Sequence, residues 1–207
     1  KITALTANLT AGDIIFPAGA YGKQMKGLHA IMTEATDLFG ISPASYSLWK
    51  ATQFDPGSAS VLSFAIVQKA IAAGVARGLK GDVVCLVAPG HWDNLLTEQT
   101  AQRMLDTSYK TEELLIGSKA ITFYAQCGKV SIIPSIYCKE GQAYIMAPEI
   151  MARVGSLDIT FNRPGFEGKF FFDLPSHNGV ELRALSDQSI FVSKPGSMVL
   201  IKNLKID

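Results

Sequence analysis

The residue best placed to do chemistry is His91, in the segment Asp82–Leu96 (DVVCLVAPGHWDNLL). An apolar run, Val83–Val87, and a Pro-Gly turn precede it, so His91 is expected at the carboxyl end of a strand and the start of a helix. Active sites of α/β proteins lie at that position, and a carboxylate such as Asp93 or Asp106 could assist a histidine base there. The simpler interpretation, which we favour, is a helix-start residue that bonds only locally.

The other nucleophiles and bases lack partners in the sequence. Cys85 lies inside the apolar run, where a thiol behaves as a small hydrophobe, whereas a Cys–His pair with His91 needs an exposed, acidic thiol. His29 stands far from the other histidines, and His177 lies in a turn sequence, Ser-His-Asn-Gly. Glu112-Glu113 belongs to a polar stretch that we interpret as a solvated loop, because adjacent side chains diverge.

Metal, cofactor and nucleotide motifs are missing from the sequence. Its three cysteines (Cys85, Cys127 and Cys138) are widely spaced and form no CxxC pair, which argues against a zinc site or a disulfide framework and favours a reducing compartment. The sequence has no glycine-rich phosphate loop, no HExxH and no GxSxG. Trp49 and Trp92 are expected to anchor a core or an interface. We therefore predict no catalytic, cofactor-binding or metal-binding residues, and no enzyme.

Composition points to a well-filled core and to covered surface. The chain has 207 residues, of which 48% are hydrophobic and only 18% charged, against about 25% charged in an average protein. Nineteen basic and eighteen acidic residues give a formal net charge of +1, without a basic stripe. A specific nucleic-acid site is therefore not predicted. No apolar run approaches the roughly 20 residues of a membrane-spanning helix, so we expect no membrane partner.

The elements that would position these residues begin with a helix. We predict it from Ser60 to about Arg77, capped by Ser58 or Ser60, and buried on several sides because most of its circumference is apolar. The apolar run Val83–Val87 then predicts a central strand covered on both faces. A second helix follows over His91–Arg103, and Asp106–Ser118 is expected to be an exposed loop.

The remaining segments are mainly β-like. Lys1–Gly22 predicts a hairpin, and Tyr21–Pro56 a loop-rich stretch with a short helix near Thr33–Phe39. A further hairpin is expected between Asp158–Phe161 and Lys169–Phe172, and the alternation over Val180–Ala184 predicts a half-buried strand. Other strands are expected at residues 121–125, 130–133, 136–138, 143–146, 190–192 and 198–201. The expected class is α+β, a mixed sheet flanked by helices plus β-hairpins.

The order of these motifs resembles a known family. The helix, the strand, the turn APGHW, the polar loop and the segment IPSIYCKEGQAYIMAP resemble the axial domain of tailed-phage major capsid proteins, the Hong Kong 97-type fold, and most of all prophage-encoded ones. Ala88 stands where that family commonly has Asn. Glu181–Leu204 (ELRALSDQSIFVSKPGSMVLIKNL) resembles its return strands to the peripheral domain. The resemblance covers roughly Leu38–Leu204, and the family's amino-terminal arm, extended loop and spine helix have no candidate here.

The resemblance implies a domain division and a structural role. Residues 1–57 would be a β-rich part of the peripheral domain with an amino-terminal hairpin, 58–180 the axial domain, and 181–207 return strands to the peripheral domain. Pentamers and hexamers of the protein would form the icosahedral capsid around packaged DNA, with scaffold or portal proteins as partners. The protein would be made in the bacterial host cytoplasm and end in the virion, with Asp106–Ser118 as the axial contact.

Three alternatives stay open at this point. The first is a small α/β enzyme that uses His91. The second is another virion part, such as a tail or head-decoration protein, which a long buried helix over Ser60–Arg77 would count against. The third is a shell protein of an encapsulin-type bacterial compartment, which shares the fold and differs in its contents.

Overall fold

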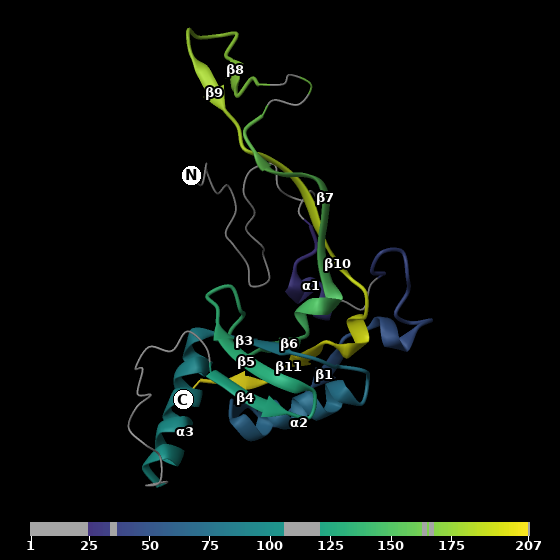
Figure 1. The fold of residues 1–207 in the computed structure, drawn as a ribbon, viewed down its shortest axis with the longest axis vertical. Helices are drawn as coiled ribbons and strands as arrows, with labels where there is room; N and C mark the ends of the chain where they lie inside the picture. Colours follow the sequence, from purple (N-terminus) through teal and green to yellow (C-terminus); the bar gives the residue numbers. More distant parts are fainter. Residues whose placement is uncertain (1–24, 34–36, 106–120, 163–164, 166–167, 207) are drawn as a thin grey trace, which may run out of the picture.

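A computed structural model describes residues 25–33, 37–105, 121–162, 165 and 168–206, with 99–105 described by their backbone alone. The predicted hairpin Lys1–Gly22 and loop Asp106–Ser118 lie outside the described residues. Twelve strands, three α-helices and several short 3-10 turns are placed in the described part. They form two parts, a body built on one large sheet and a long arm that projects from it (Figure 1).

The body is a six-stranded mixed sheet, which confirms the predicted α+β class. The central strand β3 pairs in parallel with β5 and antiparallel with β6, and β11 is antiparallel to β6 and parallel to β1. The order across the sheet is β1 (Thr52–Phe54), β11 (Val199–Ile201), β6 (Ala143–Met146), β3 (Val83–Val87), β5 (Gly128–Pro134) and β4 (Ile121–Ala125).

Two helices contribute to the core on one face of this sheet. They are α2 (Phe64–Val75) and α3 (Pro89–Leu105), and Val67, Ile71 and Leu95 belong to the same buried cluster as Cys85. The helix cap is Ser63, whose Oγ accepts the Ile66 N–H, so the prediction of Ser58 or Ser60 was wrong.

Ser60 instead begins strand β2 (Ser60–Val61), which pairs with β12 (Leu204–Lys205). The prediction that α2 is buried on several sides was also wrong. No further layer among the described residues covers its outer side, so its buried positions form one stripe: Val67, Ala70, Ile71 and Gly74.

The opposite face is covered over part of its width. Helix α1 (Leu28–Thr33) and the segment that includes Trp49, which lies in η1 (Ser47–Trp49), pack there against Tyr144, Met146 and Leu200. Helix α1 covers Leu28–Thr33 and reaches the core through Ile31 and Met32, whereas residues 34–36 of the short helix predicted near Thr33–Phe39 lie outside the described residues. Strand β3 is central, yet Val84 and Leu86 are only half-buried, so its coverage on both faces is incomplete.

The arm is a two-stranded ribbon with a smaller hairpin at its far end (Figure 1). Strand β7 (Met151–Thr160) leaves the body after the turn η3 (Pro148–Ile150) and pairs antiparallel with β10 (Leu185–Val192). Strands β8 (Phe171–Asp173) and β9 (Val180–Leu182) pair at the tip.

The predicted hairpin between Asp158–Phe161 and Lys169–Phe172 was wrong, because the two segments pair with β10 and β9 respectively. The strand expected over Val180–Ala184 does form, as β9, but it ends at Leu182 and the expected burial of its apolar face was wrong. Val180 and Leu182 are exposed, since no other described layer covers the tip.

The elements cross both predicted domain boundaries. Strand β1 precedes residue 58 and β11 follows residue 180, yet both belong to the sheet that holds β3. The boundary at 180/181 falls inside β9. Glu181–Leu204 does return to the body, through η4 (Pro195–Ser197) and β11. The division into 1–57, 58–180 and 181–207 stays a prediction about this fold.

Candidate assembly surfaces

His91 has a structural environment. It is fully buried, and its Nε2 accepts the Gly141 N–H at 3.1 Å, which ties the start of α3 to the chain before β6. Since Nε2 accepts, the proton of the neutral ring sits on Nδ1, which has no hydrogen-bond partner among the described residues. Burial lowers the pKa of His91, against a smaller opposing effect of Glu140. The bond joins residues 50 apart in the chain, so the expectation of purely local bonding was wrong, and the buried ring is not the exposed base that an enzyme hypothesis needs.

The cysteines and tryptophans also serve packing. Burial raises the pKa of the Cys85 thiol to about 12, and it raises the pKa of Cys127 and of Cys138 as well. A thiol with a raised pKa is a poor nucleophile at neutral pH. Trp92 packs against the core on the α2 face, and Trp49 donates from Nε1 to the Leu38 carbonyl at 2.9 Å.

The remaining candidates do not form a site in the described part of the chain. Glu112-Glu113 and Asp106 lie outside it, Asp93 is exposed on α3, and His177 stays in its turn, where its Nδ1 lies 2.7 Å from Ser176 Oγ. Within the described residues, no three His, Cys, Asp or Glu side chains gather as metal ligands. No helix of that part is long and apolar enough to span a membrane.

His29 joins α1 to the sheet through a directional hydrogen-bond chain. Lys139 Nζ lies 2.9 Å from His29 Nε2, His29 Nδ1 lies 3.0 Å from Tyr144 Oη, and that hydroxyl donates to Gln142 Oε1 at 3.1 Å. Because a lysine ammonium can only donate, Nε2 must accept and the ring must be neutral. Partial burial lowers the pKa of His29, and the neighbouring charge of Lys139 lowers it further.

These two histidines make the fold sensitive to acid. Both have a folded-state pKa below the unfolded value of about 6.5. Their contribution to stability is therefore complete above pH 6.5 and is lost as the pH falls from 6.5 through their lowered folded-state pKa values. We expect the melting temperature to fall between pH 7.5 and 5.5. Thermal unfolding of the double variant His29→Gln/His91→Gln should show a smaller pH slope than wild type. An unchanged slope would contradict this assignment.

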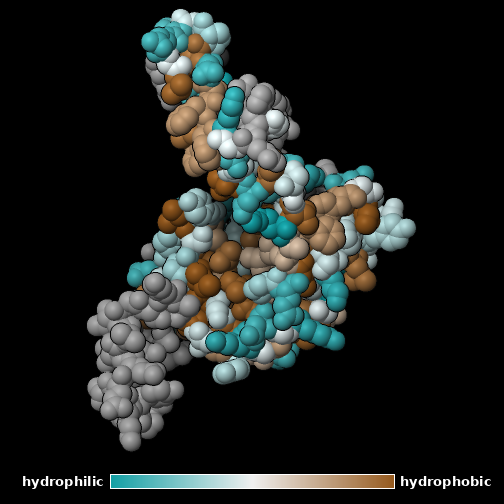
Figure 2. All heavy atoms as spheres, turned by 45° about the horizontal axis from the view of Figure 1, so that its top comes forward, coloured by the Kyte–Doolittle hydropathy of each residue, from teal (hydrophilic) through white to brown (hydrophobic). Residues whose placement is uncertain are grey.

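The arm carries apolar side chains on a scaffold too thin to bury them. Two-stranded ribbons are marginal in water on their own, and their edges leave backbone groups unpaired. Figure 2 shows apolar side chains at the foot of the arm and again along it towards the tip. The exposed large apolar residues of the arm are Val154, Leu157, Ile159, Phe161, Phe170, Phe171, Leu174, Val180, Leu182 and Phe191.

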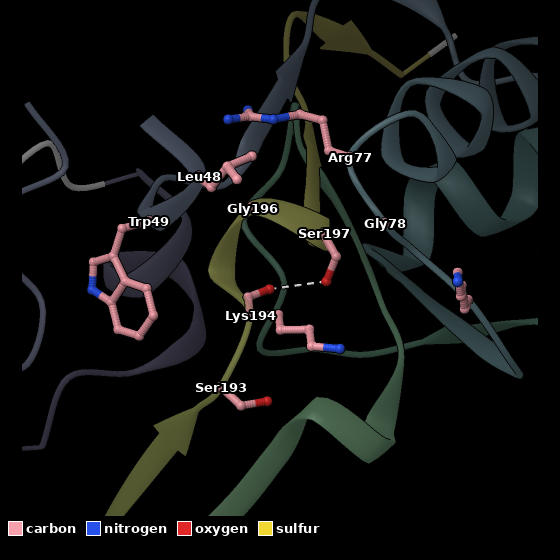
Figure 3. A pocket seen from close by; sticks show the side chains of 9 residues that line it. Leu48, Trp49, Arg77, Gly78, Ser193, Lys194, Gly196 and Ser197 are labelled. Atoms are coloured by element: carbon pink, nitrogen blue, oxygen red, sulfur yellow. Dashed lines mark hydrogen bonds between the residues drawn. The ribbon is translucent and has the colours of Figure 1, made fainter. Parts of the chain in front are cut away.

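A second surface lies on the body, where the chain returns from the arm. It is a cavity of about 400 Å³, which we call the basic pocket, and Figure 3 shows the side chains that line it. Leu48 and Trp49 supply an apolar wall, and Arg77, Lys80 and Lys194 supply positive charge. The other lining residues are Gly78, Ser193, Gly196 and Ser197. None of these described lining residues is acidic.

Sequence reasoning missed both surfaces. The basic pocket takes its cations from positions 77, 80 and 194, which only the return of the chain brings together. The arm did leave a signal, the run Phe170–Phe172, whose consecutive aromatic residues cannot all face one core from a strand.

Comparison with solved structures identifies the fold. One chain of the cyanophage A-1(L) capsid asymmetric unit matches with a TM-score of 0.55 and 14% identity, over 80% of this chain and 54% of that chain. Two further matches are more distant. A virus-like particle from Pyrococcus furiosus matches with a TM-score of 0.44 and 14% identity, over 73% of this chain and 54% of that chain. The SrpI encapsulin from Synechococcus elongatus matches with a TM-score of 0.44 and 13% identity, over 86% of this chain and 60% of that chain. No protein-family model and no curated protein matches the chain.

The chain therefore has the Hong Kong 97-type capsid fold that its sequence predicted. More particularly, it shares that fold with a chain of a cyanophage capsid, of which it spans little more than half the length.

Proposed function

We propose that this protein is a structural component of a closed protein shell, and more narrowly of a phage head that encloses packaged DNA. The fold shared with a chain of a phage capsid carries the proposal. The projecting arm supports it, because its exposed apolar side chains need cover that neighbouring copies can provide. The protein would act by association and not by turnover, in keeping with the structural roles of His91 and Cys85.

In this proposal the partners are first of all further copies of the same protein. Contacts between different surfaces of neighbouring copies close into rings when the rotation between them permits, which gives pentamers and hexamers. Scaffold or portal proteins are the further partners we expect. The protein would be made in the cytoplasm of a bacterial host and reside in the virion. The loop Asp106–Ser118, outside the described residues, stays our candidate for contacts around the ring axes.

Electron microscopy of the protein produced from its complete gene tests the proposal. We expect closed particles with icosahedral symmetry, because heterologous contacts of this kind close into a finite shell. Deletion of residues 106–118 should leave the protein folded but abolish closed particles. A protein that stays monomeric at all concentrations would overturn the proposal, and shells that hold a protein cargo and exclude DNA would place it among encapsulin-type compartments instead.

A further inference from the structure

The tip of the arm has one apolar face that carries a single carboxylate. In the hairpin of β8 and β9, Phe171 lies opposite Leu182 and Asp173 lies opposite Val180. Side chains alternate along a strand and directly paired residues share a face, so these four point to the same side. The exposed fractions of Phe171, Val180 and Leu182 are 55%, 60% and 52%, and Asp173 is exposed as well. We call these four residues the tip face.

On the other side of the same hairpin, the side chains contact one another. Arg183 lies over the ring of Phe172, 4.8 Å from its centroid, and its Nη2 donates to Glu181 at 2.7 Å. Phe172 and Glu181 are half-buried as a result. The carboxylate of Asp173, in contrast, makes no hydrogen bond or ion pair within the described part of the chain. The side of the hairpin that lacks cover is therefore the tip face.

The basic pocket offers the opposite charge beside a similar apolar surface. Arg77 already bonds the Ser47 carbonyl at 2.6 Å and Thr52 Oγ1 at 3.3 Å. Lys80 and Lys194 are exposed, and the ammonium group of neither makes a hydrogen bond or ion pair in the described part of the chain. Leu48, with 67% of its surface exposed, and the half-buried Trp49 stand beside these ammonium groups. The pocket is thus shaped for an apolar surface that carries an acid.

The two surfaces cannot meet within one chain. The hairpin of β8 and β9 lies at the far end of the arm, whereas the pocket lies in the body, where the chain leaves β10 for η4 (Figures 1 and 3). We propose that the tip face of one copy docks in the basic pocket of a second copy, with Asp173 against Lys194 and Lys80, and with Phe171 and Leu182 against Leu48 and Trp49. This inference rests on the proposed function, because it names a contact through which copies would associate.

Charge reversal with mixing tests this contact. The variant Asp173→Lys places a cation on the tip against the cations of the pocket, and Lys194→Glu places a carboxylate in the pocket at the position that would face Asp173, so each should weaken the contact between its own copies. We expect each alone to weaken self-association about tenfold in sedimentation velocity. The equimolar mixture should recover association, because position 173 of each variant then faces a residue of opposite charge at position 194 of the other variant. Lys69→Glu, the same charge change at an exposed position of α2 that does not line the pocket, is the matched control and should associate like wild type.

The outcomes separate this contact from the proposed function. Variants that assemble like wild type, alone and mixed, would overturn the contact while closed particles still supported a shell protein. Recovery on mixing without closed particles under any condition would support the contact and overturn the shell. If Lys194→Glu left association unchanged and instead abolished salt-dependent binding of duplex DNA, the pocket would be a phosphate site, and the docking of the tip would be wrong.

Discussion

Gly155→Ala is expected to disrupt the arm and to weaken self-association at least tenfold, while the body keeps its melting temperature. Gly155 lies in β7, where β10 approaches so closely that an added Cβ would collide with the Asp187 carbonyl oxygen and lie 2.7 Å from Gln188 Cα. Both obstacles are backbone atoms, and the pairing register shifts on either side of Asp187. The two strands cannot move apart there without losing their backbone pairing, because the register shifts at Asp187 already distort the pairing at this point.

Two measurements check this result. Sedimentation velocity should show the loss of association, and thermal unfolding of the body should agree with wild type within about 2 °C, because the arm contributes to the core only at its foot, through Met151, Ile190 and Val192. The matched control is Gly179→Ala, also in the arm, whose added Cβ would meet only Leu174 Cδ1 at an ordinary 3.7 Å. Gly179→Ala should associate like wild type. Equal behaviour of the two variants would show that the ribbon is not the assembling part.

Ile145→Ala is expected to destabilise the whole body by about 3 kcal/mol. Ile145 is fully buried on β6 between two paired strands, opposite Cys85 on β3 and Val199 on β11. Neither flanking strand can collapse into the space left behind, because each is held by its own hydrogen bonds. For a protein of this size, that loss lowers the melting temperature by about 9 °C.

Denaturant unfolding measures this effect as a lower midpoint with an unchanged slope. Tyr124→Ala, on the edge strand β4 with 81% of its surface exposed, is the control and should change the free energy of unfolding by less than about 0.5 kcal/mol. A loss below about 1 kcal/mol for Ile145→Ala would show that the centre of the sheet is not the rigid core described above.

The segments that bury a continuous face were the ones the sequence could predict. Val83–Val87 became the central strand β3, and the apolar stretch after Ser60 became α2, because each has an apolar pattern that only one secondary structure can bury. The predictions of the exact helix cap and of the extent of burial were wrong. They depend on how many layers cover each element, and the sequence of one segment does not state that number.

The arm was the least predictable part. Its strands pair over long sequence separations, Met151 with Val192 and Thr160 with Leu185, so local turn signals such as Pro164-Gly165 pointed to the wrong partners. Its residues alternate without a core to define the buried face, which weakens the usual register signal. The same absence of a core leaves the apolar residues of the arm exposed, and so makes it a candidate assembly surface.

By itself, the sequence determined the α+β class, the central strand and the buried position of Cys85 in that strand, because each depends on a local apolar pattern. Only the tertiary structure decided the rest. In the tertiary structure Lys194 and Lys80 line the same pocket, and Asp173 lies on an exposed apolar face at the end of the arm. These two surfaces are too far apart to meet in one chain. Such juxtapositions come from strand pairing across the chain, which no local pattern encodes.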